Sequence, residues 1–210
     1  LGVYLLRETL GYNTYIKIPI VNLFIRNIKL DFSNLVFIIV IVIINVFILV
    51  GTQNGVNFTD GLDSLLANVT IVVTIFYIIE SILKFNLSLC FVNIAMLSLL
   101  FALRKYNKYP AKVFMGDTGS LMLGAYVGGM ALLLDIQYFL PIFGFVYMME
   151  VISVILQVSY FKMTKGKRIF KMAPIHHHFE KCGWSENKVV NVFTIITIIA
   201  CIISFVLIWI

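Results

Sequence analysis

The chain has 210 residues, of which 61% are hydrophobic and only 12% are charged. A soluble domain has about 45–50% apolar and about 25% charged residues, so this chain lacks the polar side chains needed to cover a water-facing surface. A lipid bilayer accepts an apolar exterior, and the composition therefore predicts an integral membrane protein. The net charge of +6 comes mainly from segments between apolar runs and gives no support for nucleic-acid binding. Three scattered cysteines predict neither a disulfide framework nor a zinc site.

The N-terminal segment carries two structural signals. The chain starts at Leu1 and shows no basic leader before a short apolar stretch, so we expect no signal peptide. Residues 1–6 are apolar and resemble the end of an earlier span. Alternating polar and apolar residues then predict a small external β-hairpin near residues 15–30.

Long apolar segments follow, each close to the roughly 20 residues that cross a hydrocarbon core. The predicted spans are 32–50, 65–83, 87–103, 119–135, 139–160 and 189–210. The predicted fold is therefore an all-α polytopic integral membrane protein, with about six transmembrane helices and an N-terminal stub. Residues 1–210 are expected to form a single transmembrane domain.

Basic residues predict the orientation. Most of the 16 Lys and Arg residues lie in segments 104–112 and 162–188, which two spans separate. The positive-inside rule places both segments, together with segment 51–64, on the cytoplasmic side and the C-terminus outside. Two acids lie within spans. Glu80 is expected to reach the interface from the end of its helix, and Glu150 is expected to face protein because a charge in contact with lipid is costly.

The first polar segment, 57–63, reads Asn-Phe-Thr-Asp-Gly-Leu-Asp. On a helical turn Asp60 and Asp63 would share a face, and two nearby carboxylates repel unless a cation or hydrogen-bond donors compensate. They could therefore contact a ligand or a metal ion. The alternative is that Thr59 or Asp60 caps the next helix.

The second polar segment, 114–120, reads Phe-Met-Gly-Asp-Thr-Gly-Ser and opens an apolar helix. Gly116 and Gly119 permit a tight turn and close approach of the backbone. Free N–H groups at a helix N-terminus suit phosphate, and Asp117 there suits Mg²⁺, which prefers a few carboxylates plus phosphate oxygens. A capped turn is again the alternative.

The third polar segment holds the only histidines, His176, His177 and His178, downstream of the basic run 165–168. On a helix the three rings would fan over about 200°, so they could not all ligate one metal ion. Imidazole can donate to phosphate or move a proton near neutral pH. The basic run is either a topology signal or an attraction for an anionic nucleotide or lipid phosphate.

Together these segments offer carboxylates for a metal ion, cationic and imidazole donors for phosphates, and a membrane setting. That combination favours phosphoryl transfer, in which catalysis is mostly positioning and charge neutralisation. The residues by themselves do not name a substrate.

The motifs resemble those of a known family. Segments 57–63 and 110–120 are similar to motifs of the polyprenyl-phosphate N-acetylhexosamine-1-phosphate transferases, of the glycosyltransferase family 4 type. Segment 173–180, followed by Gly183 and Trp184, resembles the branch that uses UDP-N-acetylmuramoyl-pentapeptide. The resemblance implies Mg²⁺-dependent transfer of phospho-N-acetylmuramoyl-pentapeptide to undecaprenyl phosphate. The products would be lipid I and UMP, formed on the cytoplasmic face of the bacterial inner (plasma) membrane.

The resemblance also implies roles for individual residues. Asp117 would bind Mg²⁺ at the diphosphate. Phe114 would stack on uracil with Asn107 nearby, and Gln157 would contact the nucleotide. The implied catalytic set is completed by Asp60, Asp63, His176, His177 and His178, and the implied substrate-binding set by Asn57, Lys112 and Gly116.

The chain departs from the family pattern in two ways. The family carries an adjacent Asp-Asp pair and its first helices upstream of these motifs, and no Asp-Asp pair occurs in this chain. Ser64 also stands where Gly is usual, and Phe58 where Leu is usual. We therefore expect a C-terminal fragment that lacks the N-terminal helices and is inactive or nearly so by itself.

Two alternative functions remain. One, in the same class, is transfer of N-acetylglucosamine 1-phosphate from its UDP carrier to a polyprenyl phosphate. The other is a membrane transporter or scaffold, although transporter sites usually lie near the bilayer midplane and these motifs lie at one face. The sequence leaves open a direct or covalent mechanism and the oligomeric state, with a homodimer as one option.

Overall fold

The computed structural model describes residues 15–16, 28–29 and 35–210. The long helices are α3 (Leu35–Thr59), α4 (Leu65–Leu83), α5 (Leu87–Asn107), α6 (Gly116–Leu133), α8 (Phe145–Met163) and α10 (Glu186–Trp209). The short helical elements are η1 (Gln137–Phe139), α7 (Leu140–Phe143) and α9 (Ile175–Lys181). The helical fold class expected from the sequence is confirmed for the described residues.

Among the residues that the structure describes, five helices are long and apolar enough to cross a membrane. They are Ile39–Thr59 within α3, and all of α4, α5, α8 and α10. The chain is therefore a multi-pass membrane protein. α6, which covers most of the predicted span 119–135, is not among the five, and it opens with five glycine or polar residues that lower its mean hydropathy. The expected count of six spans stays a prediction.

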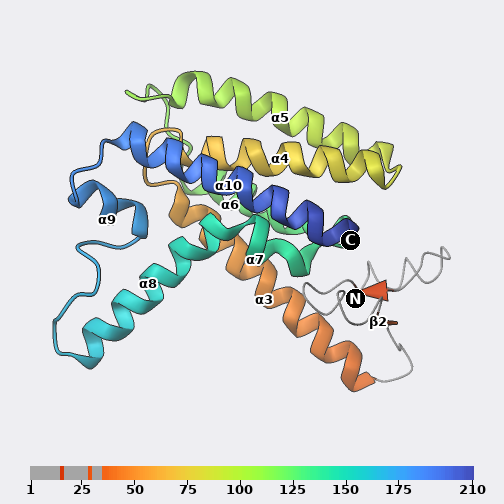
Figure 1. Ribbon diagram of the computed structural model, residues 1–210, viewed down its shortest axis with the longest axis horizontal. Coiled ribbons are helices and arrows are strands. Elements are labelled where there is room, and N and C mark those ends of the chain that lie inside the picture. Colours follow the sequence, from red (N-terminus) through yellow and green to blue (C-terminus); the bar gives the residue numbers. More distant parts are fainter. Residues whose placement is uncertain (1–14, 17–27, 30–34) are drawn as a thin grey trace.

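The helices pack in two overlapping groups. α3 crosses α6 and α8, while α4 lies between α5 and α10, and α6 also touches α4 (Figure 1). The crossing of α3 with α6 is close because a Cβ on Gly124 would lie only 2.6 Å from the Cα of Gln53. A glycine at this point lets the two backbones approach, which holds the C-terminal half of α3 beside the start of α6.

α3 extends further than the sequence predicted. The expected span ended at residue 50 with a loop at 51–64, whereas the helix continues to Thr59. No proline interrupts this segment, and the Asn54 side chain donates to the Val50 carbonyl at 2.8 Å. The first polar motif therefore begins on a rigid helix, and only residues 60–64 form the connection to α4.

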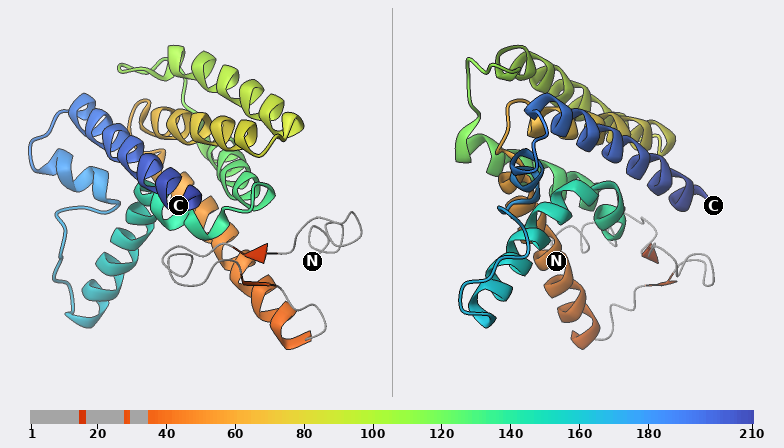
Figure 2. Two further views of the ribbon diagram at one scale, coloured as in Figure 1. Left: turned by 45° about the vertical axis from the view of Figure 1, so that its right-hand side comes forward. Right: turned by 60° about the vertical axis from the view of Figure 1, so that its left-hand side comes forward.

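The predicted span 139–160 is also divided. η1 and α7 precede Gly144, and α8 starts at Phe145. A Cβ on Gly144 would lie 2.7 Å from the Leu140 carbonyl oxygen, and Pro141 stands in the first turn of α7. Figure 2 shows α8 diverging from the other helices and α9 lying between α8 and the start of α10. The membrane-length helix expected at 139–160 is therefore α8, which begins at Phe145 after a break at Gly144.

The predicted β-hairpin falls mostly on residues outside the described part of the chain. Within the described residues, Tyr15 pairs with Lys29 and Ile16 with Ile28 in an antiparallel arrangement. The hairpin itself stays a prediction.

The two acids within spans are both fully buried. Glu80 is 0% exposed and accepts a hydrogen bond from the indole Nε1 of Trp209 at 3.0 Å, so the expectation that it reaches the interface is wrong. The ends of α4 and α10 pack together and enclose it. Glu150 is also 0% exposed and lies against α9, as expected for an acid that faces protein.

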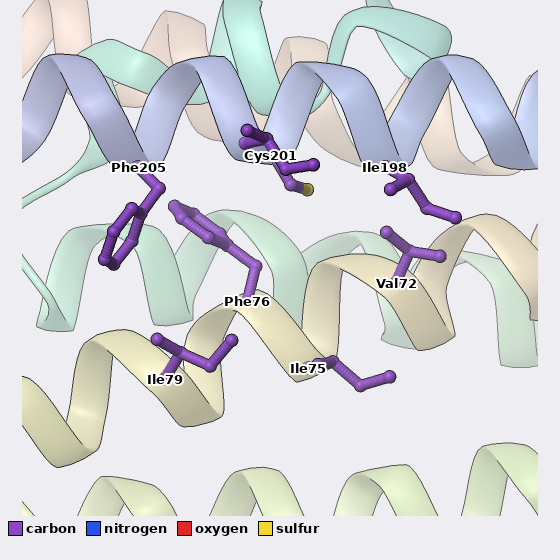
Figure 3. Close-up of a pocket in the computed structure, with 8 residues that line it drawn as sticks. Val72, Ile75, Phe76, Ile79, Ile198, Cys201 and Phe205 are labelled. Atoms are coloured by element: carbon purple, nitrogen blue, oxygen red, sulfur yellow. The ribbon is translucent and has the colours of Figure 1, made fainter.

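An apolar groove of about 390 Å³ lies between α4 and α10 (Figure 3). Its lining side chains are Val72, Ile75, Phe76, Ile79, Ile198, Cys201, Ile202 and Phe205. None of these side chains carries a formal charge, so the groove offers no group for phosphoryl chemistry. The functional site must be sought at the polar ends of the helices.

Candidate active site

The three polar motifs meet at one end of the helix bundle. α3 and α5 end there, α4, α6 and α10 begin there, and α9 lies beside them, on the left of Figure 1. The segments that the sequence assigned to one membrane face are therefore neighbours in space.

Asn57 joins the first motif to the second. From the last turn of α3, its Nδ2 donates to Oδ1 of Asp117 at 3.3 Å and to Oγ of Ser120 at 2.8 Å. Asp117 is exposed, whereas Ser120 is buried. One amide thus orients an exposed carboxylate in the first turn of α6.

Asp60 lies near the same carboxylate. Its backbone N–H donates to the carbonyl oxygen of Asn57 at 3.1 Å, which turns the chain directly after α3. Burial, and to a smaller degree the charge on Asp117, raises the pKa of Asp60 to about 6. Two acids from separate motifs therefore share one electrostatic environment, which a cation or a set of donors would relieve.

Helix capping does not explain these residues. The N-cap of α4 is Ser64, whose φ is 60° and whose side chain makes no capping bond. Thr59 donates its hydroxyl back to the Gly55 carbonyl at 2.7 Å within α3. The N-cap position of α6 is Met115, again without a side-chain cap. The capping alternative is wrong for both motifs.

Asp63 connects the first motif to two other elements. Its Oδ2 accepts from the backbone N–H of Ala111 at 2.8 Å, and its own N–H donates to Oε1 of Glu186 at 2.6 Å. Residues 60–64 do not continue a helix, so Asp60 and Asp63 have different surroundings rather than a shared face. Asp63 fixes the connection between α3 and α4 against the segment before α6 and the start of α10.

Asn107 is buried at the end of α5 and has two backbone partners. Its Oδ1 accepts from the Ser64 N–H at 2.9 Å, and its Nδ2 donates to the Val113 carbonyl at 2.9 Å. These bonds hold the second motif against the first. Its expected position near a uracil stays a prediction.

Phe114, Lys112 and Gly116 lie on the open side of this junction. Phe114 is 74% exposed, and the Lys112 side chain is exposed. Gly116 has a φ of +67°, a conformation that side-chain-bearing residues rarely adopt, and no heavy atom lies within 4 Å of a Cβ placed there. An exposed ring, a cation and an accessible backbone suit a nucleotide diphosphate, and their roles stay predictions.

The histidines form a short helix, α9, and each has a different partner. Nδ1 of His176 lies 3.1 Å from Oε2 of Glu150, and both side chains are 0% exposed. Nδ1 of His177 lies 2.6 Å from Oε2 of Glu180. Nδ1 of His178 accepts from the backbone N–H of Lys171 at 3.1 Å. Each imidazole thus has its own polar partner, and the rings of His176 and His177 also pack together, with their centroids 4.1 Å apart.

Gln157 holds the segment between α8 and α9. Its Oε1 accepts from the backbone N–H groups of Phe170 at 2.9 Å and Ile169 at 3.2 Å, and its Nε2 donates to the Phe170 carbonyl at 3.3 Å. The amide is thus engaged with protein, and nucleotide contact by Gln157 stays a prediction.

Four polar residues at this end were missed as site residues. Glu150, Glu180 and Glu186 contact His176, His177 and Asp63, and Ser120 contacts Asn57. Glu180 could have been found, because it stands three residues after His177 on a predicted helix. Glu186 has no local signal, since only the packing of α10 beside residues 60–64 brings it there.

These acids are the side chains available for the expected Mg²⁺ site. Within the part of the chain that the structure describes, no group of three or more His, Cys, Asp or Glu side chains could hold a metal ion. Mg²⁺ is commonly held by one or two carboxylates together with substrate phosphates rather than by an all-protein cage. The neighbouring acids Asp117 and Asp60 fit such a shared site, whereas the histidines do not.

Asp60 and Asp117, with the residues that orient them, form an acidic junction at one end of the bundle. The helices and this junction define a multi-pass membrane protein with a polar site at that end. The sequence profile of glycosyl transferase family 4 matches residues 7–135, and the chain belongs to this family. The family resemblance of the motifs is therefore confirmed.

Individual relatives point to one branch. The chain is 52% identical over 159 residues to the phospho-N-acetylmuramoyl-pentapeptide-transferase of Clostridium perfringens, covering 76% of this chain and 50% of that protein. The proteins of the same name from Clostridium acetobutylicum and Carboxydothermus hydrogenoformans are 51% identical over 160 residues and 48% identical over 159 residues. Each of these matches covers 76% of this chain, and they cover 50% and 49% of the respective relatives. The chain thus spans about half the length of the curated relatives it matches.

Proposed function

We propose that the protein containing this chain transfers phospho-N-acetylmuramoyl-pentapeptide from its UDP carrier to undecaprenyl phosphate, giving lipid I and UMP. The observation that carries this proposal is the Asn57–Asp117 contact, which joins two acidic motifs at the end of membrane helices. The named relatives supply the substrate class.

The proposed site uses the chain's residues for binding and orientation. The exposed ring of Phe114 offers a stacking surface for a nucleobase. Lys112 and the free N–H groups at the start of α6 suit the diphosphate. Asn57 keeps the Asp117 carboxylate in one orientation, and Asp63 keeps Asp60 beside it.

Mg²⁺ is proposed as the cofactor, held by Asp117 with Asp60 as the neighbouring acid. When bound, the ion would neutralise diphosphate charge, which is the main requirement of phosphoryl transfer. His177 remains half-buried beside Glu180 and is the histidine best placed to contact phosphate or sugar, because His176 is fully enclosed and His178 binds backbone.

The orientation is proposed as well. Basic segments 104–112 and 162–188 adjoin the end of the bundle that carries the site, and under the positive-inside rule they support a cytoplasmic location for this end at a bacterial inner membrane, with the C-terminus outside. A reporter fused after Ile210 tests this arrangement, since activity of a periplasm-dependent reporter is expected and activity of a cytoplasm-dependent one would contradict it. Light scattering of the purified protein tests for a homodimer.

The transfer reaction can be tested directly. Membranes containing the protein expressed from its complete gene are supplied with undecaprenyl phosphate, Mg²⁺ and radiolabelled UDP-N-acetylmuramoyl-pentapeptide. A labelled lipid and UMP are expected, and chelation with EDTA should stop their formation. Product from UDP-N-acetylglucosamine instead would favour the sister activity, and no product from either sugar would contradict the transferase proposal. The 210 residues alone are expected to give little or no product.

A further inference from the structure

A buried acid outside the sequence motifs lies directly behind the candidate site. Glu150, in the second turn of α8, is 0% exposed, and its Oε2 is 3.1 Å from Nδ1 of His176, which is also 0% exposed. The distance is within ion-pair range, but the polar atoms of both side chains, those of this contact included, form no regular hydrogen bond in the described part of the chain. An ionisable group enclosed in an apolar helix is costly without a partner, so His176 is the reason that this acid can be retained.

The His176 ring is held from two sides. A Cβ placed on Gly61 would lie 2.1 Å from Nε2 and 2.7 Å from Cε1 of the ring, so the imidazole lies on the Gly61 backbone. Nδ1 faces Glu150 and Nε2 faces the connection between α3 and α4. Gly61 directly follows Asp60, which is one residue of the acidic junction. The His176 ring therefore lies between Glu150 of α8 and the turn that contains Asp60 and Gly61.

We propose that Glu150 is a positioning residue that holds the His176 ring, with a proton on Nδ1, against Gly61 and so fixes Asp60 relative to Asp117. The proposal rests on the proposed function, because it assumes that this turn lines the transferase cleft. A carboxylate facing one ring nitrogen sets which nitrogen carries the proton, as it does for histidines that serve metal sites.

The neighbouring histidines provide internal references. Nδ1 of His177 faces the Glu180 carboxylate, which also favours a proton on that atom. Nδ1 of His178 accepts a backbone N–H, so its proton must be on Nε2 when the ring is neutral. Because the chain contains only three histidines, selective labelling yields three rings, of which His176 and His177 are expected to carry a proton on Nδ1 and His178 on Nε2.

The matched control is the other buried acid within a span. Glu80 is equally enclosed, but it accepts from Trp209 at the end of the bundle remote from α9. E150L and E80L both replace a buried glutamate with an apolar residue of similar size. A purely structural role predicts similar effects of the two changes on transfer by folded protein, whereas positioning predicts an effect of E150L alone.

The experiment combines two readouts on the protein expressed from its complete gene. Nitrogen-15 NMR of labelled histidines, assigned by replacing each in turn, is expected to show a proton on Nδ1 of His176 in the unchanged protein and in E150Q. In E150L that signal should shift while His178 does not. For transfer, E150L should lower kcat by about 100-fold, in line with a 1 Å misplacement in an active site, and change KM for the nucleotide far less. E150Q keeps an oxygen acceptor and should recover most of kcat, and E80L should leave kcat per folded molecule within about twofold, since it touches no reacting group.

Each outcome bears on one claim. A His176 ring without a proton on Nδ1 would overturn the positioning proposal, and this measurement does not require E150L to fold. Equal kcat for E150L and E80L would overturn it as well. If the unchanged protein transfers no sugar phosphate, the proposed function fails, whereas the NMR result still stands by itself.

Discussion

Two buried glutamates allow the two ends of this molecule to be compared. Glu80 and Glu150 both lie inside apolar helices and are both 0% exposed. Glu80 accepts from an indole N–H contributed by the last turns of α10. Glu150 instead faces an imidazole that lies on Gly61, beside the acidic motifs. The same residue type thus joins helices at one end and supports a group of titratable side chains at the other.

The comparison shows that burial alone does not identify a functional acid. Glu80 and Glu150 differ in the side chain that each one faces and in the residues that this side chain contacts. Trp209 lies near the end of the chain, whereas His176 borders residues 60–64. Asp63 and Ser64 of this segment bond to α10, to the segment before α6 and to Asn107 of α5. The site end is therefore connected by polar bonds among several elements, and perturbing it should affect transfer more than stability. The following substitutions test that distinction.

The largest effect on transfer is expected at Asp117. D117N removes the charge from the acid that Asn57 orients, and release of UMP should fall by about 100-fold or more, as for loss of a group that stabilises charge in a transition state. D135N is the control. Asp135 is only partly exposed, but it follows the opposite end of α6 from Asp117, and the change should alter the rate by less than about twofold. Retention of more than a tenth of the Mg²⁺-dependent rate by D117N would contradict its assigned role.

A somewhat smaller effect is expected at Gly61. The added methyl of G61A would meet the His176 ring, so the ring or the turn must shift, and transfer should fall by about 10-fold to 100-fold. Gly51 in α3 has no heavy atom within 4 Å of a Cβ, and G51A should raise stability by up to about 1 kcal/mol through helix propensity. UMP release measures the effect of G61A on transfer, and thermal unfolding in detergent measures the effect of G51A on stability. Unchanged transfer by G61A would disprove the close contact between Gly61 and the His176 ring.

Asn57 should give the next effect. N57D replaces the amide donor with a second carboxylate beside Asp117, which adds repulsion and removes a bond, and transfer should fall by about 10-fold. N54D is the control, because Asn54 is exposed and its side chain bonds the Val50 carbonyl in the preceding turn of its own helix. Raising the Mg²⁺ concentration should partly restore N57D if the two acids share an ion. No response to Mg²⁺ would argue against a shared site.

The smallest effect on transfer is expected at the other end of the bundle. W209F removes the indole donor to Glu80, and the free energy of unfolding should fall by about 1–3 kcal/mol, the cost of leaving a buried group with a missing partner. Transfer per folded molecule should not change. If W209F slowed transfer as strongly as G61A does, the proposed difference between the two ends would be wrong.

Several features were predictable from the sequence because they depend on local composition and pattern. The length of the apolar segments predicted the membrane helices. The distribution of the charged residues predicted that the polar motifs lie at one end of the bundle. The acidic and histidine motifs gave the candidate site residues and the family, which the profile match confirms. The membrane helices can be predicted from sequence because a bilayer-spanning helix must be apolar over its whole length, whatever it packs against.

Other features depended on packing between distant segments. The enclosure of Glu80 arises from its contact with Trp209 of α10, which no local pattern encodes. The same holds for the partners of Asp63 and His176, which come from other helices.

The sequence by itself therefore determined that this is a helical membrane protein with three polar motifs between its apolar segments, since composition and motif spacing are properties of the chain alone. Only the tertiary structure decided which acids adjoin, because Asn57 meets Asp117 through the close crossing of α3 with α6 that Gly124 permits. It also decided the partner of His176, because only the packing of α9 against α8 brings Glu150 to that ring.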